Sequence, residues 1–281
     1  MEIVIDKSYL QGASGETVRR LCEEHTVLFT ETLFYELLTT AESVRDACFA
    51  KLPARDNPVA LIPRTGPLFR YEIEHRRAAS PIADRRLAVT FRFNPRLTSR
   101  TFLHPADEET ALAEWRREVD QEVATFHEVA TGVSAWCPDL KTASGQTLRT
   151  ACEDLKRQAC SDAEITRRVY RSLGLEGFPC ASLLDPSWAL FRWVQAHLLF
   201  SLDYVGRYGF GELPQIPRRV EHDIHDIQYL LFGALCGALA TKDAEIASNF
   251  MLACPEGTLL GDHRQRTLPN CTLQRTGRAG R

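Results

Sequence analysis

The first thirty residues place two short β-branched runs on either side of an amphipathic helix. Residues 2–5 (Glu-Ile-Val-Ile) and 26–29 (Thr-Val-Leu-Phe) have the length and composition of buried strands. Between them, residues 15–24 place Val18 and Leu21 at helical spacing. Parallel strands need such a crossover helix between them, and this order of elements supplies it. The chain is therefore expected to be an α/β protein with a parallel sheet.

The second strand is followed by a helix, and regular order then breaks down. Thr30 can cap this helix through its side-chain oxygen, and Pro53 ends it, because proline cannot continue the helical hydrogen-bond ladder. Several prolines and a glycine interrupt the segment from residue 54 to residue 68. Within it, residues 64–67 (Arg-Thr-Gly-Pro) are expected to form a surface loop.

The middle of the chain has helical periodicity, and the α/β pattern returns late. Apolar residues recur at helical spacing in four stretches, residues 106–131, 148–160, 162–173 and 187–208. A further helix is expected to start near residue 221. Residues 238–241 (Ala-Leu-Ala-Thr) follow it as a third buried strand.

These patterns divide the chain into four parts. Residues 1–52 and 216–260 are expected to form two halves of one parallel sheet, residues 53–215 a mostly helical insertion, and residues 261–281 a mobile basic tail. The two halves should share a sheet, because each alone offers only one or two short strands with an open edge. The insertion could shape substrate choice, bind a protein partner or block the site.

Charge and composition exclude several classes of protein. A formal net charge of −3 argues against a globally basic nucleic-acid-binding protein, and 44% hydrophobic with 25% charged residues is ordinary for a globular chain. No apolar run reaches the roughly 18 residues of a membrane span, and the first six residues lack the features of a signal peptide. Nine scattered cysteines without a C-x-x-C pair favour reduced thiols, so a cytoplasmic protein without membrane contact is expected.

Four acidic residues lie where strands end or helices begin. Asp6 follows the first strand, and Glu36 lies in the helix after the second. Asp226 is expected to open the helix before the last strand, and Asp243 follows that strand. Ligands of parallel α/β sheets bind beyond the carboxyl ends of the strands. Carboxylates that share a cleft repel one another unless a cation holds them, and Mg²⁺ or Mn²⁺ suits oxygen ligands, so the pattern predicts a divalent metal site.

Four segments carry a resemblance to a known family. They are residues 3–8 (Ile-Val-Ile-Asp-Lys-Ser), 30–38 (Thr-Glu-Thr-Leu-Phe-Tyr-Glu-Leu-Leu), 223–230 (Asp-Ile-His-Asp-Ile-Gln-Tyr-Leu) and 240–243 (Ala-Thr-Lys-Asp). In letters and in order they resemble PIN-domain nucleases, which have an acid after the first strand and a glutamate in a following helix. That family also has a third acid at the opening of a helix and a Thr/Ser-x-Asp motif after the next strand. The chain departs from the family in the long interval between its second and third acids, which the helical insertion fills.

The resemblance implies a PIN-like fold and a Mg²⁺- or Mn²⁺-dependent nuclease that hydrolyses phosphodiester bonds, most often as an endoribonuclease acting on RNA. It assigns both metal binding and catalysis to four acids, Asp6, Glu36, Asp226 and Asp243, with Thr241 and Ser8 as supporting hydroxyls. In such a site the metal orients and deprotonates a water for in-line attack, so no nucleophilic side chain is required.

Basic residues near these acids are candidates for binding the phosphates of a substrate. They are Lys7, Lys242, Arg218 and Arg219, with further arginines in the tail. Because a net charge of −3 does not attract a nucleic acid globally, binding would depend on such a local patch. Ordinary solvated surface charge is the alternative for all four.

Two other functions fit parts of the sequence. The first is a non-catalytic PIN-like scaffold that binds RNA or a protein partner through the insertion, with the acids serving only as helix caps. The second is a His-Asp metal phosphohydrolase that uses a His-Asp pair of residues 222–226, with His197 and Asp243 as further ligands. The all-α fold of that second class disagrees with the α/β pattern of this chain.

Overall fold

One parallel sheet of five strands organises the α/β part of the chain. The computed structural model describes residues 1–80, 82–93, 106–174, 178–210 and 217–261. Within these ranges the strand order is β3-β2-β1-β4-β5, and all the pairings are parallel. The strands are β1 (Glu2–Ile5), β2 (Thr26–Thr30), β3 (Ala60–Ile62), β4 (Ala238–Ala240) and β5 (Thr258–Leu260). The expected class, an α/β protein with a parallel sheet flanked by helices, is confirmed.

The pairing of β1 with β4 joins the two ends of the chain. Val4 lies opposite Leu239 in a parallel register. All three residues of β4 and all but the first residue of β1 are buried, as expected for a parallel sheet covered by helices. The prediction that residues 1–52 and 216–260 contribute to one sheet is confirmed.

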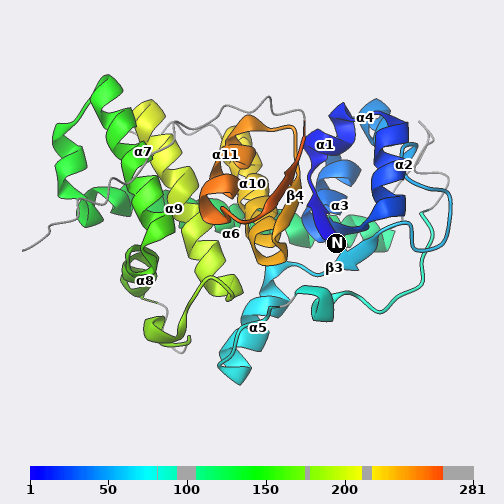
Figure 1. Cartoon of the computed structure of the whole chain (residues 1–281), viewed down its shortest axis with the longest axis horizontal. Helices are drawn as coiled ribbons and strands as arrows, with labels where there is room; N and C mark the ends of the chain where they lie inside the picture. The colour runs from blue at the N-terminus through cyan, green and yellow to red at the C-terminus, as the bar shows by residue number, and fades with distance from the viewer. Residues whose placement is uncertain (81, 94–105, 175–177, 211–216, 262–281) are drawn as a thin grey trace, which may run out of the picture.

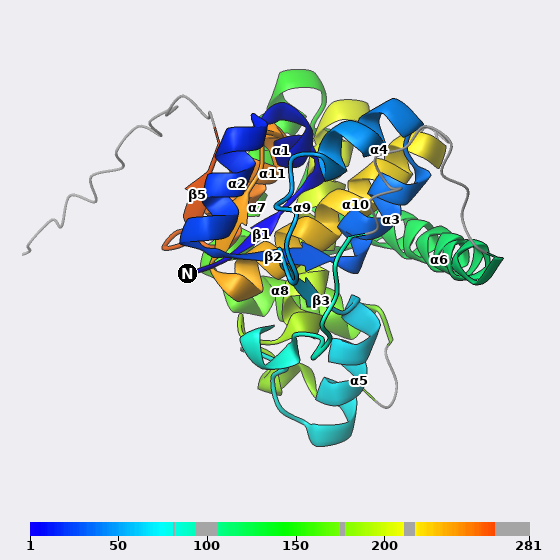
Figure 2. The same ribbon diagram turned by 90° about the vertical axis from the view of Figure 1, so that its right-hand side faces the viewer.

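Helices flank the sheet and extend the molecule to one side. In Figure 1, α7, α8 and α9 lie at one end, α1 to α4 lie at the other, and α10 and α11 lie between them. Figure 2 shows α6 projecting beyond the sheet, and α5 lies below the sheet in both views. The helices are α1 (Lys7–Gly12), α2 (Gly15–Glu24), α3 (Glu31–Thr39), α4 (Glu42–Phe49), α5 (Thr65–His75), α6 (Ala106–Trp136), α7 (Gly145–Ser161), α8 (Ala163–Ser172), α9 (Ala189–Tyr208), α10 (Pro217–Cys236) and α11 (Ala244–Ala253).

The boundary predicted at residue 53 is wrong. Residues 60–62 form β3, which belongs to the sheet beside β2. This strand has only three residues and lies between Pro58 and Pro63, so no apolar run of ordinary strand length marks it. The same shortness explains why β5 was not predicted. The mostly helical middle of the chain therefore begins after the third strand and not at residue 53.

Three local predictions are also corrected. Residues 64–67 do not form a loop, because Pro67 fits the first turn of α5, where a missing N–H costs no hydrogen bond. The helix expected after β2 is in fact two helices, α3 and α4. Asp226 lies in the third turn of α10, which begins at Pro217 rather than near residue 221.

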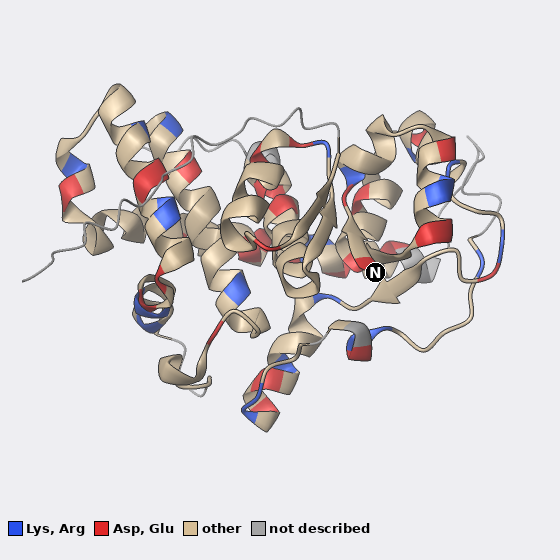
Figure 3. Cartoon of the chain, in the orientation of Figure 1, with Lys and Arg blue, Asp and Glu red and all other residues tan. Residues whose placement is uncertain are grey.

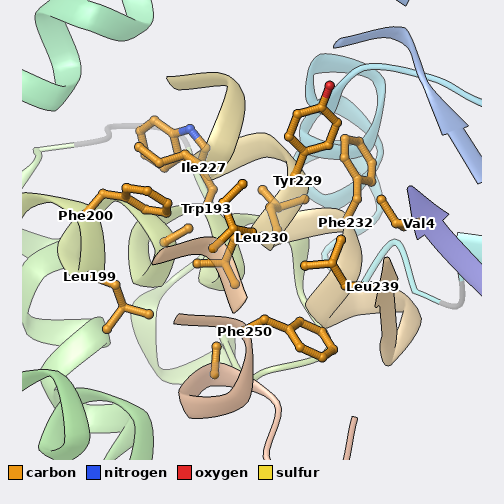
Figure 4. Packing of buried hydrophobic residues seen from close by; sticks show 14 of the residues in the cluster. Val4, Trp193, Leu199, Phe200, Ile227, Tyr229, Leu230, Phe232, Leu239 and Phe250 are labelled. Atoms are coloured by element: carbon orange, nitrogen blue, oxygen red, sulfur yellow. The ribbon is translucent and has the colours of Figure 1, made fainter. Parts of the chain in front are cut away.

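The helical middle and the sheet share one hydrophobic core. In Figure 4, Leu230 of α10 lies between Phe200 of α9 and Leu239 of β4, and Phe250 of α11 lies below Leu230. Helix α9 also packs against α6, α7 and α8. Because buried apolar surface stabilises a fold by roughly 25 cal/mol per Å², helices that complete this core belong to the same cooperative unit. Helix α9 thereby supports α10, which carries Asp226.

Every helix in the described ranges is too short or too polar to span a lipid bilayer. The eight cysteines in those ranges carry free thiols. The basic tail predicted for residues 261–281 lies outside the described residues from residue 262 onward.

A buried carboxylate from α5 holds the start of α9. Glu72 is fully buried. It accepts hydrogen bonds from the backbone N–H groups of Ala189 (2.7 Å), Leu190 (2.9 Å) and Ala79 (2.9 Å). The first N–H groups of a helix lack partners within the helix, and negative charge there is favoured by the helix dipole. Burial raises the pKa of Glu72, while the three hydrogen bonds act in the opposite direction.

Glu72→Gln should lower the free energy of unfolding by about 2 kcal/mol, because its NH₂ group would face backbone N–H groups that now donate to a carboxylate. Chemical denaturation measures this change. Glu74→Gln is the matched control, since Glu74 is exposed on the same helix and should change stability by less than about 0.5 kcal/mol. Equal stability of the two variants would show that the contacts of Glu72 do not hold α9.

Candidate functional site

The carboxyl ends of β1 and β4 lie where the strand order reverses. The chain adds β2 and β3 on one side of β1, and β4 and β5 on the other. At such a point in a parallel sheet the connections leave in opposite directions and open a crevice that commonly binds ligands. Asp6 follows β1 directly, and its backbone N–H donates to the carbonyl of Ala240 at the end of β4 (3.1 Å). The polar residues that follow the two strands therefore meet at this edge of the sheet.

Three groups donate to the buried carboxylate of Asp6. The backbone N–H of Tyr9 donates to it at 2.7 Å, so that Asp6 caps the start of α1. The hydroxyls of Thr241 (2.5 Å) and Ser8 (2.8 Å) donate to its Oδ2 atom. Ser8 and Thr241, the two predicted supporting hydroxyls, thus both lie against Asp6.

Asp243 is connected to Asp6 through these hydroxyls. The Oγ1 of Thr241 accepts a hydrogen bond from the backbone N–H of Asp243 (3.0 Å), and the Oγ of Ser8 accepts one from the backbone N–H of Lys242 (2.8 Å). The Oδ1 of Asp243 accepts from the first N–H groups of α11 and caps that helix. Asp6 and Asp243 are therefore fixed by the ends of neighbouring strands.

Glu36 comes from α3, and both of its carboxylate oxygens have partners. Its Oε2 accepts a hydrogen bond from the hydroxyl of Tyr229 at 2.6 Å. Its Oε1 lies 3.4 Å from the Nζ of Lys7. The exposed fraction is 6% for Glu36 and 1% for Tyr229. An unpaired carboxylate at this depth would be strongly destabilising, so these two partners account for the tolerance of a charge here.

Asp226 differs from the other three acids in having no such partner. Among the residues that the structure describes, none donates a hydrogen bond to its carboxylate or forms an ion pair with it. It is partly buried and lies three residues before Tyr229, so the two side chains leave the same face of α10. Because Tyr229 reaches Glu36, this face of the helix is directed at the other acids.

Electrostatic interactions connect Asp226 with each of the other three predicted acids. Burial raises the pKa of Asp6 to about 6, with a smaller rise from the charge of Glu36 and an opposing effect of its hydrogen bonds. Burial also raises the pKa of Asp226 well above its usual range, and the charges of the other three acids and of Asp223 raise it further. Acidic positions on α10 and α11, which pack against each other, lie near the middle of the molecule in Figure 3. The structure thus brings the four predicted acids together; we call them the acidic cluster.

The acidic cluster has the donors that a hard divalent cation requires, but their present arrangement is not a metal site. Carboxylate oxygens suit Mg²⁺ or Mn²⁺, and a cation would relieve the repulsion that raises the pKa of Asp226. Within the described ranges, however, no three His, Cys, Asp or Glu side chains are grouped to hold one ion. In this arrangement Glu36 is bound to Lys7 and Tyr229, and one oxygen of Asp243 caps a helix.

Of the four basic residues predicted to bind phosphate, the two lysines have described contacts and the two arginines do not. Lys7 pairs with an acid of the cluster. The Nζ of Lys242 donates to the carbonyl of Gly12 at the end of α1 (3.0 Å). Arg218 and Arg219 lie in the first turn of α10, and their side chains are outside the described part of the structure. The structure therefore gives partners within the fold to both lysines.

The His-Asp metal site considered as an alternative is not assembled. His197 is fully buried, with its Nε2 3.2 Å from the Oε2 of Glu122 on α6 and its Nδ1 2.9 Å from the carbonyl of Trp193. His225 is buried against the ring of Tyr35. These contacts assign both histidines to packing between helices, and the parallel sheet differs from the all-α fold that such a site requires.

Tyr229 is the residue of this site that the sequence analysis missed. Its apolar neighbours make it indistinguishable from a core aromatic residue by pattern alone. Two signals could have identified it. It follows Asp226 by three residues on one helix face, and a buried tyrosine hydroxyl normally has a hydrogen-bond partner.

No protein-family model matches the chain, and no curated protein or solved structure matches it.

Without a divalent cation, the free energy of unfolding of the wild type should fall as the pH rises from about 4 to about 7. The Asp6→Asn variant lacks this titrating group and should not show the fall. The pKa of Asp6 is about 6 in the folded protein against 3.8 for the free side chain, so the folded state binds the proton more tightly. Stability from this group is present below pH 3.8 and is lost as the pH passes through 6. The loss should amount to about 3 kcal/mol, because one pKa unit corresponds to about 1.36 kcal/mol.

Denaturant unfolding of both proteins in a chelating buffer measures this difference across the pH range. The variant should be the more stable of the two near pH 7, since asparagine carries no charge and still accepts the hydrogen bond from Tyr9. The hydroxyls of Ser8 and Thr241 can accept from its NH₂ group, unlike the backbone N–H groups around Glu72. If the free energies of unfolding of the two proteins changed equally with pH, the raised pKa of Asp6 would be contradicted.

Proposed function

We propose that the chain is a metal-dependent nuclease of the PIN-like type that hydrolyses phosphodiester bonds in RNA. The observation that carries this proposal is that Asp6 and Asp243, from opposite ends of the chain, are joined through the hydroxyl of Thr241 beside the ends of β1 and β4, with Glu36 and Asp226 within electrostatic reach of Asp6. They come from four different elements, so their meeting is a property of the whole fold. Their position at the reversal of strand order is where ligands of parallel sheets commonly bind.

Mg²⁺ or Mn²⁺ is the cofactor that suits this donor set, with the four acids as its candidate ligands. Such a cation lowers the pKa of a bound water and neutralises charge on a phosphate. The chain itself positions the carboxylates. Ser8 and Thr241 hold the carboxylate of Asp6 by hydrogen bonds. The carboxylate of Asp226 has no hydrogen bond or ion pair with another described residue.

The substrate class follows from the charge of the site and from the resemblance to PIN-domain nucleases. A phosphodiester is an anion, and four carboxylates repel it unless a cation offsets their charge. A metal-assisted reaction satisfies this requirement. The four motifs that resemble those nucleases supply the acids of the cluster, and RNA is the substrate on which that family most often acts.

One observation favours the non-catalytic alternative. Glu36 is already compensated by Lys7 and Tyr229, so the fold can hold this acid without a metal ion. A scaffold of this kind would bind RNA or a protein partner through its helices and leave RNA uncut. A cleavage assay separates the two functions.

Asp226→Asn should reduce Mn²⁺-dependent cleavage of RNA by about a hundredfold or more, because the amide keeps the size of the side chain and loses the charge of a ligand. The variant should remain folded, since the carboxylate has no hydrogen bond to another described residue that the change would break. Purified full-length chain acting on end-labelled single-stranded RNA measures the rate.

Asp154→Asn is the matched control for this experiment. Asp154 is exposed on α7 and pairs with Arg157 at 2.6 Å, away from the acidic cluster, and its replacement should leave cleavage unchanged. Undiminished cleavage by Asp226→Asn would remove Asp226 from the active site. Intact RNA with the wild-type chain in either metal would favour the scaffold.

A further inference from the structure

The ion pair between Lys7 and Glu36 lies inside the acidic cluster. Lys7 is the first residue of α1 and directly follows Asp6, and its Nζ is 3.4 Å from the Oε1 of Glu36. The exposed fraction of the side chain is 19% for Lys7 and 7% for Glu36. Because water screens a partly buried pair much less than a surface pair, the ammonium is an effective counter-ion for the cluster.

The two partners of Glu36 differ in their freedom to move. Tyr229 is packed within α10, and Figure 4 shows its hydroxyl pointing away from the apolar cluster that holds its ring. Lys7 carries its charge on a flexible four-carbon stem and keeps a path to solvent. Tyr229 therefore fixes one oxygen of Glu36, while Lys7 can leave the other.

We propose that Lys7 is an internal counter-ion that takes the place of the divalent cation at Glu36, and that its ammonium leaves Glu36 when the cation binds. This inference rests on the proposed function. The acidic cluster has four acids, but within the described residues no three of them are grouped to hold an ion. The presence of an internal counter-ion accounts for this arrangement. The ammonium and the phenol occupy the two carboxylate oxygens of Glu36.

The exchange has opposite consequences for metal and substrate. A single ammonium offsets only part of the charge of four carboxylates, whereas a divalent cation can interact with several of them at once and repels the ammonium. Lys7 therefore competes with the cation. Once released, it places a positive group beside the site, where it favours the phosphate of an incoming strand.

Isothermal titration of Mn²⁺ into the full chain tests the competition. Lys7→Gln should bind Mn²⁺ about tenfold more tightly than the wild type, equivalent to about 1.4 kcal/mol, because the competing charge is gone. Lys7→Arg keeps the charge and should stay within about threefold of the wild type. Lys7→Met, which keeps the apolar stem, replaces the glutamine variant if that variant unfolds.

Lys242→Gln is the matched control. It removes the same charge beside another acid of the cluster, Asp243, but the ammonium of Lys242 donates to the carbonyl of Gly12. Loss of this charge alters only the general field at the site, so the affinity for Mn²⁺ should rise by less than about threefold.

The cleavage reaction gives a second readout. Lys7→Gln should lower the Mn²⁺ concentration that gives half-maximal activity and raise the KM for RNA, because the side chain opposes the metal and assists the phosphate. A residue with a purely structural role would weaken both interactions together.

The outcomes separate this inference from the proposed function. Lys7→Gln binding Mn²⁺ no more tightly than Lys242→Gln would overturn the inference, while Mn²⁺ binding by the wild type would leave the proposed function in place. If Lys7→Gln bound Mn²⁺ and the wild type and Lys242→Gln did not, the inference that Lys7 competes with the cation would be supported. No Mn²⁺ binding by any of the proteins would overturn both.

Discussion

The pairing of β1 with β4 is the contact on which the rest of the structure depends. It places Asp6 next to Thr241, which is 235 positions away in the chain, and the two side chains form a hydrogen bond of 2.5 Å. It also sets the position of α10, because that helix runs into β4 through a single turn at Gly237. The φ angle of 77° at this turn is one that glycine adopts without strain. The faces of α10 that carry Asp226 and Tyr229 are thereby directed at the end of β1.

The same arrangement places negative charges close together at an energetic cost, and each acid is compensated in a different way. Asp6 receives hydrogen bonds from two hydroxyls and a helix start, Asp243 caps α11, and Glu36 is held by a phenol and an ammonium. Asp226 has no compensation from another described residue, and its pKa is raised well above its usual range. Unfavourable arrangements of this kind persist in proteins mainly where they serve a function.

Local signals predicted much of this fold. The apolar runs before Asp6 and Thr30 identified β1 and β2, and the long apolar stretch ending at Tyr208 identified α9. Topological reasoning joined β1 to the late strand, because parallel strands without partners would leave open edges. These patterns placed Asp6 and Asp243 directly after strands, whereas the expectation that Asp226 opens its helix is wrong.

What could not be predicted depends on contacts between distant residues. Strands β3 and β5 have three residues each, too few to show a period, so only their pairing in the sheet defines them. Nothing in the sequence indicated that α9 packs against both α10 and α11. The two partners of Glu36, Lys7 and Tyr229, lie 29 and 193 positions away in the chain. Such pairings become visible only when the chain is folded.

The proposed function requires that a divalent cation bind among these carboxylates. Crystals of the full chain equilibrated with Mn²⁺ and measured at a wavelength where manganese scatters anomalously test it most directly. We expect a manganese peak among Asp6, Asp226 and Asp243, with Glu36 turned away from Lys7. Well-defined density for these side chains without a manganese peak, or a peak elsewhere while Lys7 remains on Glu36, would contradict the account.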